Sequence, residues 1–201
     1  MDFTAWLSLA TICLLGAMTP GQSFIVILKH AMAGRFNGLS ASIGHGLGIA
    51  LYALLTVVGL AIVIKETPWL FNLIKFTGVA FLVWLAYQGL RAKAGNTRFS
   101  TEQFSTTLWK SFYEGLMIAC LNPKIIIFFL ALFSQFVEPD AAWQQNAVLI
   151  GTVTGIDTLW YCLLSLVLSH SRVLNKLREK SHIIEKFSGL VLLAVAVRVI
   201  M

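Results

Sequence analysis

Two ionisable side chains lie deep inside long apolar segments of the sequence. Asp157 lies near the middle of segment 146–169, and His45 lies in segment 39–64. A charged residue at the centre of a membrane helix costs about 2.5–3.5 kcal/mol on insertion scales, and such residues usually face a protein interior. Asp157 can therefore bind a substrate ammonium group or take up a proton, unless it only forms a structural ion pair with Lys124. His45 can relay protons or serve only in packing.

Two short polar segments, each with a proline, interrupt apolar segments. They are Thr19, Pro20, Gly21 and Gln22 in the first apolar segment, and Asn122, Pro123 and Lys124 in the fourth. Proline removes a backbone donor and clashes with the preceding turn, and lipid does not satisfy the carbonyl groups that such a break frees. Paired breaks in corresponding segments point to the substrate site of a transporter. The alternative is an ordinary proline kink.

The half-helix after each break is expected to direct backbone N–H groups and a positive dipole end inward, where they suit a substrate carboxylate. Asn122 is expected to cap the second half-helix and can also contact substrate. Three roles are open for Lys124: it can hold the substrate carboxylate, neutralise Asp157, or hydrogen bond to carbonyl groups of the broken helix. Glu114, at the start of the fourth segment, is interpreted as an interfacial residue.

The elements that position these residues are predicted to be membrane-spanning helices. The chain has 201 residues, of which 58% are hydrophobic and 12% are charged, whereas soluble domains average about 25% charged residues. A bilayer core needs about 20 apolar residues in a helix. Six segments qualify: 4–28, 39–64, 68–90, 111–137, 146–169 and 183–200. We therefore predict an all-α integral membrane protein in which residues 1–201 form a single transmembrane domain.

Basic residues divide unequally between the segments that connect these helices. Segments 29–38, 91–110 and 170–182 contain two, four and four Lys or Arg residues, whereas the opposite side has Lys65 only. Because cytoplasmic loops carry excess Lys and Arg, we predict that 91–110 is a cytoplasmic loop and that both termini face the outer side. The net charge is +6, but the basic residues are spread over these connecting segments and form no single basic stripe. This distribution argues against nucleic-acid binding.

Short sequence matches relate the two halves of the chain at offsets of 103, 107 and 111 residues. The matched pairs are Pro20 with Pro123, Gly44 with Gly151, Gly48 with Gly155, and Lys75 with Lys186. Because each half has three segments, the halves must cross the membrane in opposite senses. We predict two inverted three-helix repeats, about 1–95 and 108–201, with broken first and fourth helices. The four glycines are predicted to allow close helix packing.

The sequence has no pattern typical of a metal, cofactor or nucleophile site. Cys13, Cys120 and Cys162 lie singly in apolar segments, without the spacing of a metal or redox site. No nucleophile–base pair or phosphate-binding loop is recognisable. We therefore predict no catalytic residue, no bound metal and no cofactor.

Together these residues resemble the LysE/RhtB superfamily of bacterial amino-acid exporters, in particular its RhtB-like branch. The resemblance covers the whole chain and rests on Thr19-Pro20-Gly21, Gly38, Gly78-Val79-Ala80-Phe81-Leu82, Asn122-Pro123-Lys124, Phe128-Phe129, Gln135-Phe136, and Asp157 followed by Trp160. It implies export of amino acids or close derivatives, driven by the proton motive force, at the cytoplasmic membrane of a bacterium. Gln22 stands where the family usually has a second proline, and Ala50 stands where exporters of basic amino acids carry a second acidic residue.

The sequence thus predicts a secondary transporter that exports an amino acid. The absence of an acidic residue at Ala50 favours a neutral substrate, such as homoserine, threonine, leucine or a cysteine derivative. The expected partners are this substrate, protons and membrane lipids, and both a monomer and a homodimer are compatible with the sequence. Two alternatives stay open at this point: a membrane-embedded enzyme or electron-transfer subunit, and a membrane scaffold that transports nothing.

Overall fold

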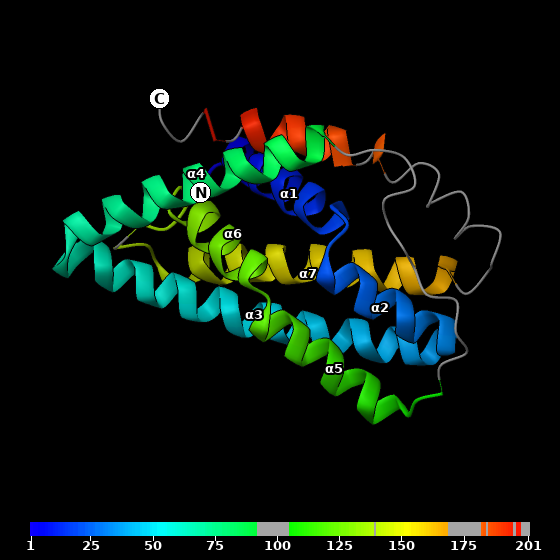
Figure 1. Cartoon of the computed structure of the whole chain (residues 1–201). Helices are drawn as coiled ribbons and strands as arrows, with labels where there is room; N and C mark the ends of the chain where they lie inside the picture. The colour runs from blue at the N-terminus through cyan, green and yellow to red at the C-terminus, as the bar shows by residue number, and fades with distance from the viewer. Residues whose placement is uncertain (92–104, 139, 169–181, 184, 195, 198–201) are drawn as a thin grey trace.

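The computed structural model describes residues 1–91, 105–138, 140–168, 182–183, 185–194 and 196–197. The regular structure in these ranges is helical, as predicted. In chain order (Figure 1) the helices are α1 (Phe3–Met18), α2 (Gln22–Ala33), α3 (Arg35–Glu66), α4 (Pro68–Leu90), α5 (Leu108–Leu121), α6 (Pro123–Phe133) and α7 (Trp143–Leu168). Residues 185–194 are also helical and are called the C-terminal segment below.

The chain bends sharply at both proline positions. α1 and α2 meet at 63°, and α5 and α6 meet at 56°. Thr19 leaves the helical conformation, because the residue before a proline is pushed toward extended backbone angles. Asn122, which precedes Pro123, is extended for the same reason. Pro123 is then the first residue of α6, where its missing N–H removes no helical hydrogen bond.

Up to five membrane spans lie within the described residues. α3, α4 and α7 are each long and apolar enough to cross a bilayer, and each bent pair, α1 with α2 and α5 with α6, qualifies as one broken span. The first span continues to Ala33, beyond the predicted end at residue 28. The sixth predicted span, 183–200, lies partly outside the described residues.

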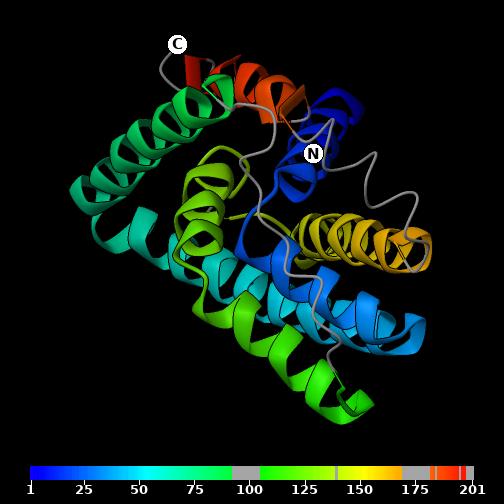
Figure 2. The ribbon, with the colours of Figure 1, turned by 45° about the vertical axis from the view of Figure 1, so that its right-hand side comes forward.

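α3 and α7 lie side by side, and α4 lies with the C-terminal segment away from them (Figures 1 and 2). α2 ends, and α3 and α5 begin, toward the right of Figure 1, where α7 also ends. α3 ends and α4 begins at the left. Successive spans therefore run in alternate directions through the bundle.

α3 approaches α5 so closely that their backbones touch. A Cβ atom added at Gly44 would overlap the carbonyl group of Phe112, and one added at Gly48 would lie 2.5 Å from the Cβ of Ala119. The contact is reciprocal, because a Cβ added at Gly115 would overlap the carbonyl group of Ala41. Glycine is therefore the residue that this helix crossing allows.

The two corresponding glycines of the second half behave differently. A Cβ added at Gly151 or Gly155 would meet no atom within 4 Å among the described residues. The close packing predicted for Gly151 and Gly155 is therefore not found, because this face of α7 is turned away from the described helices. The sequence match between Gly44 and Gly151 does not extend to their surroundings.

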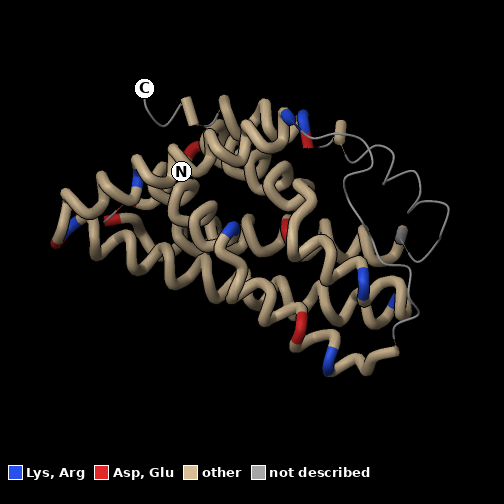
Figure 3. The backbone as a smooth tube through the Cα atoms, in the orientation of Figure 1, with Lys and Arg blue, Asp and Glu red and all other residues tan. Residues whose placement is uncertain are grey.

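Large apolar side chains cover the outside of the bundle as well as its core. Leu9, Ile49, Leu82, Phe129 and Phe133 are buried together in the core, while many other apolar side chains face outward, among them Leu55, Trp69, Leu121 and Leu159. Charged positions are sparse over the bundle and lie both at its two ends and between them (Figure 3). An apolar belt of this kind suits lipid and would be an aggregation hazard in water.

Candidate functional site

One cavity joins the two helix breaks to the middle of α3 and α7. The breaks contribute Thr19, Gly21, Gln22, Ser23, Asn122 and Lys124 to its wall, and the long helices contribute His45, Asp157 and Tyr161. Apolar side chains, including Phe128 and Phe129 of α6, complete it. Water-sized molecules can occupy about 60 Å³ of this cavity, and because one buried water needs about 10–15 Å³ on this measure, the cavity has room for a few waters. Four separate spans therefore meet around a small space that has both polar and apolar walls.

His45 and Asp157 form a hydrogen-bonded pair in this cavity. His45 Nδ1 lies 2.8 Å from Asp157 Oδ2, and the two side chains are 1% and 14% exposed. The ring of Tyr161 stands edge-on to the imidazole, with 4.9 Å between ring centroids. His45 Nε2 is buried and has no hydrogen-bond partner in the described part of the chain. When Nδ1 donates to the carboxylate, Nε2 carries the free lone pair and can accept a proton.

The two breaks are tied to one another by polar contacts. Asn122 is buried; its Nδ2 donates to Ser23 Oγ at 3.1 Å, and its Oδ1 accepts from the backbone N–H of Lys124 at 3.0 Å. Lys124 Nζ donates to the carbonyl oxygen of Thr19 at 3.4 Å. The second break therefore caps its own half-helix and also holds the first break in place.

The start of α2 is open to a ligand. Its N-cap residue is Gly21, which provides no side-chain cap, and Gly21, Gln22 and Ser23 all line the cavity. The ammonium group of Lys124 lies close by, because a Cβ added at Gly21 would be 3.5 Å from Nζ. An uncapped helix start beside a lysine favours an anionic group.

The structure brings together most of the residues that the sequence singled out. Asp157 is paired with His45, and the ion pairs of the described residues include none between Asp157 and Lys124, so that alternative is not found. Pro20 and Pro123 lie on the wall of a second cavity, beyond the breaks.

Sequence reasoning missed two side chains of the site, Ser23 and Tyr161. Ser23 comes two residues after Gly21, and Tyr161 comes four residues after Asp157, where a helix presents the same face. A helical projection from Asp157 would have indicated Tyr161, whereas Ser23 has a role only once Asn122 is placed beside it.

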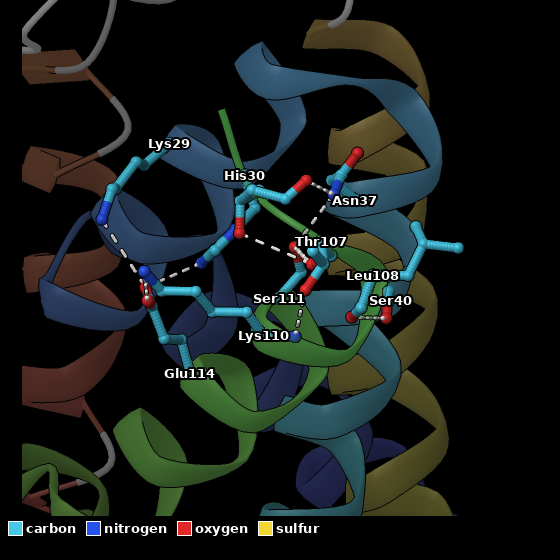
Figure 4. Close-up of polar contacts among 10 residues, drawn as sticks. Lys29, His30, Asn37, Ser40, Thr107, Leu108, Lys110, Ser111 and Glu114 are labelled. Carbon is cyan, nitrogen blue, oxygen red and sulfur yellow. Dashed lines mark hydrogen bonds and ion pairs between the residues drawn. The ribbon is translucent and has the colours of Figure 1, made fainter. Parts of the chain in front are cut away.

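A second polar cluster lies where α2 ends and α5 begins (Figure 4). His30 is fully buried, and its Nε2 lies 3.0 Å from Glu114 Oε2. The carboxylate of Glu114 is also 3.6 Å from Lys29 Nζ and 3.9 Å from Lys110 Nζ. Glu114 therefore joins α2 to α5. His30 was not recognised in the sequence, because a histidine beside Lys29 is indistinguishable from a residue of the adjoining loop.

Neighbouring contacts attach α3 to the same end of α5. Asn37 Nδ2 donates to the carbonyl oxygen of Thr106 at 3.1 Å and to Ser111 Oγ at 3.2 Å. Ser40 Oγ donates to the carbonyl oxygen of Leu108 at 2.7 Å (Figure 4). Together with the bond between His30 and Glu114, these bonds attach α2 and α3 to the start of α5.

No metal site is present among the described residues, because nowhere do three His, Cys, Asp or Glu side chains come together in a suitable group. Cys13, Cys120 and Cys162 are free thiols.

Comparison with known proteins gives consistent matches. A family model described as LysE type translocator matches residues 14–201. The chain is 30% identical to a leucine efflux protein of Klebsiella pneumoniae, over 87% of this chain and 82% of that protein. It is 27% identical to a threonine efflux protein of Escherichia coli (92% and 91%), and 31% identical to an uncharacterized membrane protein of Vibrio cholerae (79% and 78%). No solved structure gives a significant match.

Proposed function

Because the chain belongs to the family of LysE-type translocators, we propose that it exports a neutral amino acid across the cytoplasmic membrane of a bacterium. Membership of this family makes the chain a membrane transport protein and not an enzyme. The efflux of leucine and of threonine named for two relatives supports an uncharged amino-acid side chain. Homoserine and cysteine derivatives belong to the same proposed class.

The substrate is proposed to bind in the cavity between the two breaks. Its carboxylate lies at the uncapped start of α2, near Lys124, and its ammonium group lies at Asp157. The side chain then packs against Phe128 and the other apolar wall residues. The observation that carries this proposal is the placement of a cation, an open helix start and a carboxylate on the wall of one cavity.

Proton coupling is assigned to the pair of His45 and Asp157. A proton arriving from outside is taken up by this pair and weakens the hold of Asp157 on the substrate ammonium group, because a neutral carboxyl attracts a cation less. Release of the substrate outward and of the proton inward would then complete one cycle of exchange. Nε2 of His45, which has no hydrogen-bond partner among the described residues, supports this assignment.

Alternating access is proposed to use two inverted repeats, each with one broken span and the long helix that follows it. The equivalent bends of 63° and 56° support this arrangement. We assign the ends of α2 and α7 to the cytoplasm, in keeping with Lys29, Arg35 and Lys110 at this end of the bundle. Both termini are then assigned to the outer side. A homodimer stays a prediction, which light scattering of the purified protein can test.

The proposal can be tested in proteoliposomes that contain the purified protein. We expect labelled L-leucine or L-threonine to exchange with the same unlabelled amino acid across the membrane, and a pH gradient to drive net movement. Absence of exchange for every neutral amino acid would contradict the proposed substrate class. Topology is tested separately, by labelling single cysteines placed at Phe36 and at Trp143 in a chain without Cys13, Cys120 and Cys162. The two sites should react from opposite sides.

A further inference from the structure

A second cavity lies on the other side of the two breaks. It shares Thr19, Gly21, Gln22, Asn122 and Lys124 with the first cavity. The rest of its wall comes from Pro20 and Pro123, from α4 with the following Arg91, and from the C-terminal segment. Its volume of about 720 Å³ is larger than the 60 Å³ of the first cavity. The broken backbone segments therefore form a partition, and both of its faces border on a cavity.

Two opposite charges face this second cavity from neighbouring elements. Arg91 follows the last residue of α4, and Glu185 begins the C-terminal segment. These elements are in contact, because a Cβ added at Gly89 would lie 2.5 Å from the carbonyl oxygen of Glu185. Neither Arg91 nor Glu185 forms an ion pair within 4 Å among the described residues, but Lys124, which lines the same cavity, is close enough to Glu185 for their charges to attract. Arg91 instead stacks on the ring of Tyr87, 4.7 Å from its centroid.

The wall between these charges is both aromatic and polar. Trp84 and Tyr87 of α4 line it, as do the amide side chains of Gln22 and Gln88. A guanidinium group, a carboxylate and an aromatic surface in one cavity match the three parts of a zwitterionic amino acid with an apolar or small polar side chain. Arginine and carboxylate groups bind such charged ends through strong charge-assisted hydrogen bonds.

We infer that this second cavity is a vestibular binding site for a zwitterionic amino acid, in which Arg91 holds the carboxylate and Glu185 holds the ammonium group. The inference rests on the proposed export function and adds a second, separate binding site for the substrate. Lys124 lies in the partition and lines both cavities, so it can receive the carboxylate from Arg91. Arg91 lies at the end of α4 that is assigned to the cytoplasm. The second cavity is therefore the site where the substrate first binds during export.

The test measures uptake of labelled L-leucine and L-threonine into everted membrane vesicles, whose outer face is the cytoplasmic one. For Arg91→Gln and Glu185→Gln we expect the half-saturating concentration to rise about tenfold, as for the loss of one charge-assisted contact, while the maximal rate per molecule is retained. Arg91→Lys should restore most of the affinity. Arg35→Gln is the matched control, because Arg35 also stacks on an aromatic ring, that of Phe36 at 4.8 Å, but does not line this cavity. Glu66→Gln is the control for Glu185.

Substrate analogues separate the roles of the two charges. Leucinamide lacks the carboxylate, and isocaproate lacks the ammonium group. Both analogues should compete weakly with L-leucine for uptake by the wild-type protein. In Arg91→Gln the apparent affinity for leucinamide should approach that for L-leucine. In Glu185→Gln the apparent affinity for isocaproate should approach that for L-leucine. A role in folding or topology alone would lower the amount of active protein and leave these preferences unchanged.

The outcomes distinguish this inference from the proposed function. Unchanged half-saturating concentrations and unchanged analogue preferences in both variants, with normal wild-type uptake, would overturn the vestibular site and leave amino-acid export standing. A wild-type protein that moves no amino acid would overturn both. Raised half-saturating concentrations in Arg35→Gln of the same size as in Arg91→Gln would also overturn the site, since a general effect of surface charge would then account for the result.

Discussion

His45 on α3 and Asp157 on α7 are joined by a hydrogen bond of 2.8 Å between Nδ1 and Oδ2. The bond lies on the wall of the cavity between the two helix breaks. One partner comes from the first half of the chain and the other from the second. A change in the protonation of this pair therefore acts on the contact between the two halves.

A double-mutant cycle measures the strength of this pair. For residues in direct contact, interaction energies are typically about 0.5–3 kcal/mol. We expect a value in this range for His45→Ala with Asp157→Asn, from the free energy of unfolding in detergent micelles. The same cycle for Lys124→Ala with Asp157→Asn should give a smaller value, because Lys124 is bonded to Thr19. A larger interaction energy in the cycle with Lys124 would mean that Lys124, and not His45, is the partner of Asp157, which would contradict the pair described above.

Asn122 is expected to stabilise both helix breaks. Asn122→Ala removes the cap of α6, at a typical cost of about 0.5–2 kcal/mol, and leaves the buried hydroxyl group of Ser23 without its partner, at about 1–3 kcal/mol. Thermal unfolding in detergent should show a loss of stability that is greater than for Ser23→Ala, which leaves the cap intact. Equal losses for the two variants would show that the cap contributes nothing.

Gly44 and Gly155 make a matched comparison of packing. Gly44→Ala places a methyl group against the carbonyl of Phe112, and overpacking of this kind typically costs about 1–3 kcal/mol. Gly155→Ala meets open space among the described residues and should change stability by less than about 1 kcal/mol, the range of helix propensities. The reverse order of the two effects in thermal unfolding would contradict the packing of α3 on α5.

Glu114 is expected to matter through the buried side of its cluster. Glu114→Gln weakens the bond to the fully buried His30 and should lower the free energy of unfolding by about 1–3 kcal/mol. Lys110→Gln removes a half-exposed pair at 3.9 Å and should cost about 0–1 kcal/mol. Chemical unfolding of both variants in detergent checks this difference, and a larger loss for Lys110→Gln would contradict it.

The sequence predicted best those features that a lipid environment restricts most strongly. Pro20 and Pro123 were expected to disturb their helices, because proline removes a helical hydrogen bond, and Asp157 was expected to face the protein interior, because an isolated charge in lipid is costly. The partner of Asp157 could not be chosen in the same way. Lys124 was the partner that the sequence suggested, and the pairing with His45 was not predicted. Only the crossing of α3 and α7 brings His45 to the carboxylate.

Local similarity between the halves was a weaker guide. Gly44 and Gly151 match in sequence, but only Gly44 faces a neighbouring backbone. Whether a glycine serves packing depends on which side of the helix the partner takes, and short matches do not contain this information. The cluster of His30 and Glu114 joins residues 84 positions apart, so neither residue indicated the other before the helices were placed.

The most direct test of the central claim follows protons and solute together in proteoliposomes loaded with a pH-sensitive dye. When L-leucine or L-threonine moves down its gradient through the wild-type protein, we expect protons to move in the opposite direction, and we expect this proton movement to be lost in Asp157→Asn. Proton movement of wild-type size in Asp157→Asn, coupled to the same solute flux, would contradict the assignment of the proton to the pair of His45 and Asp157.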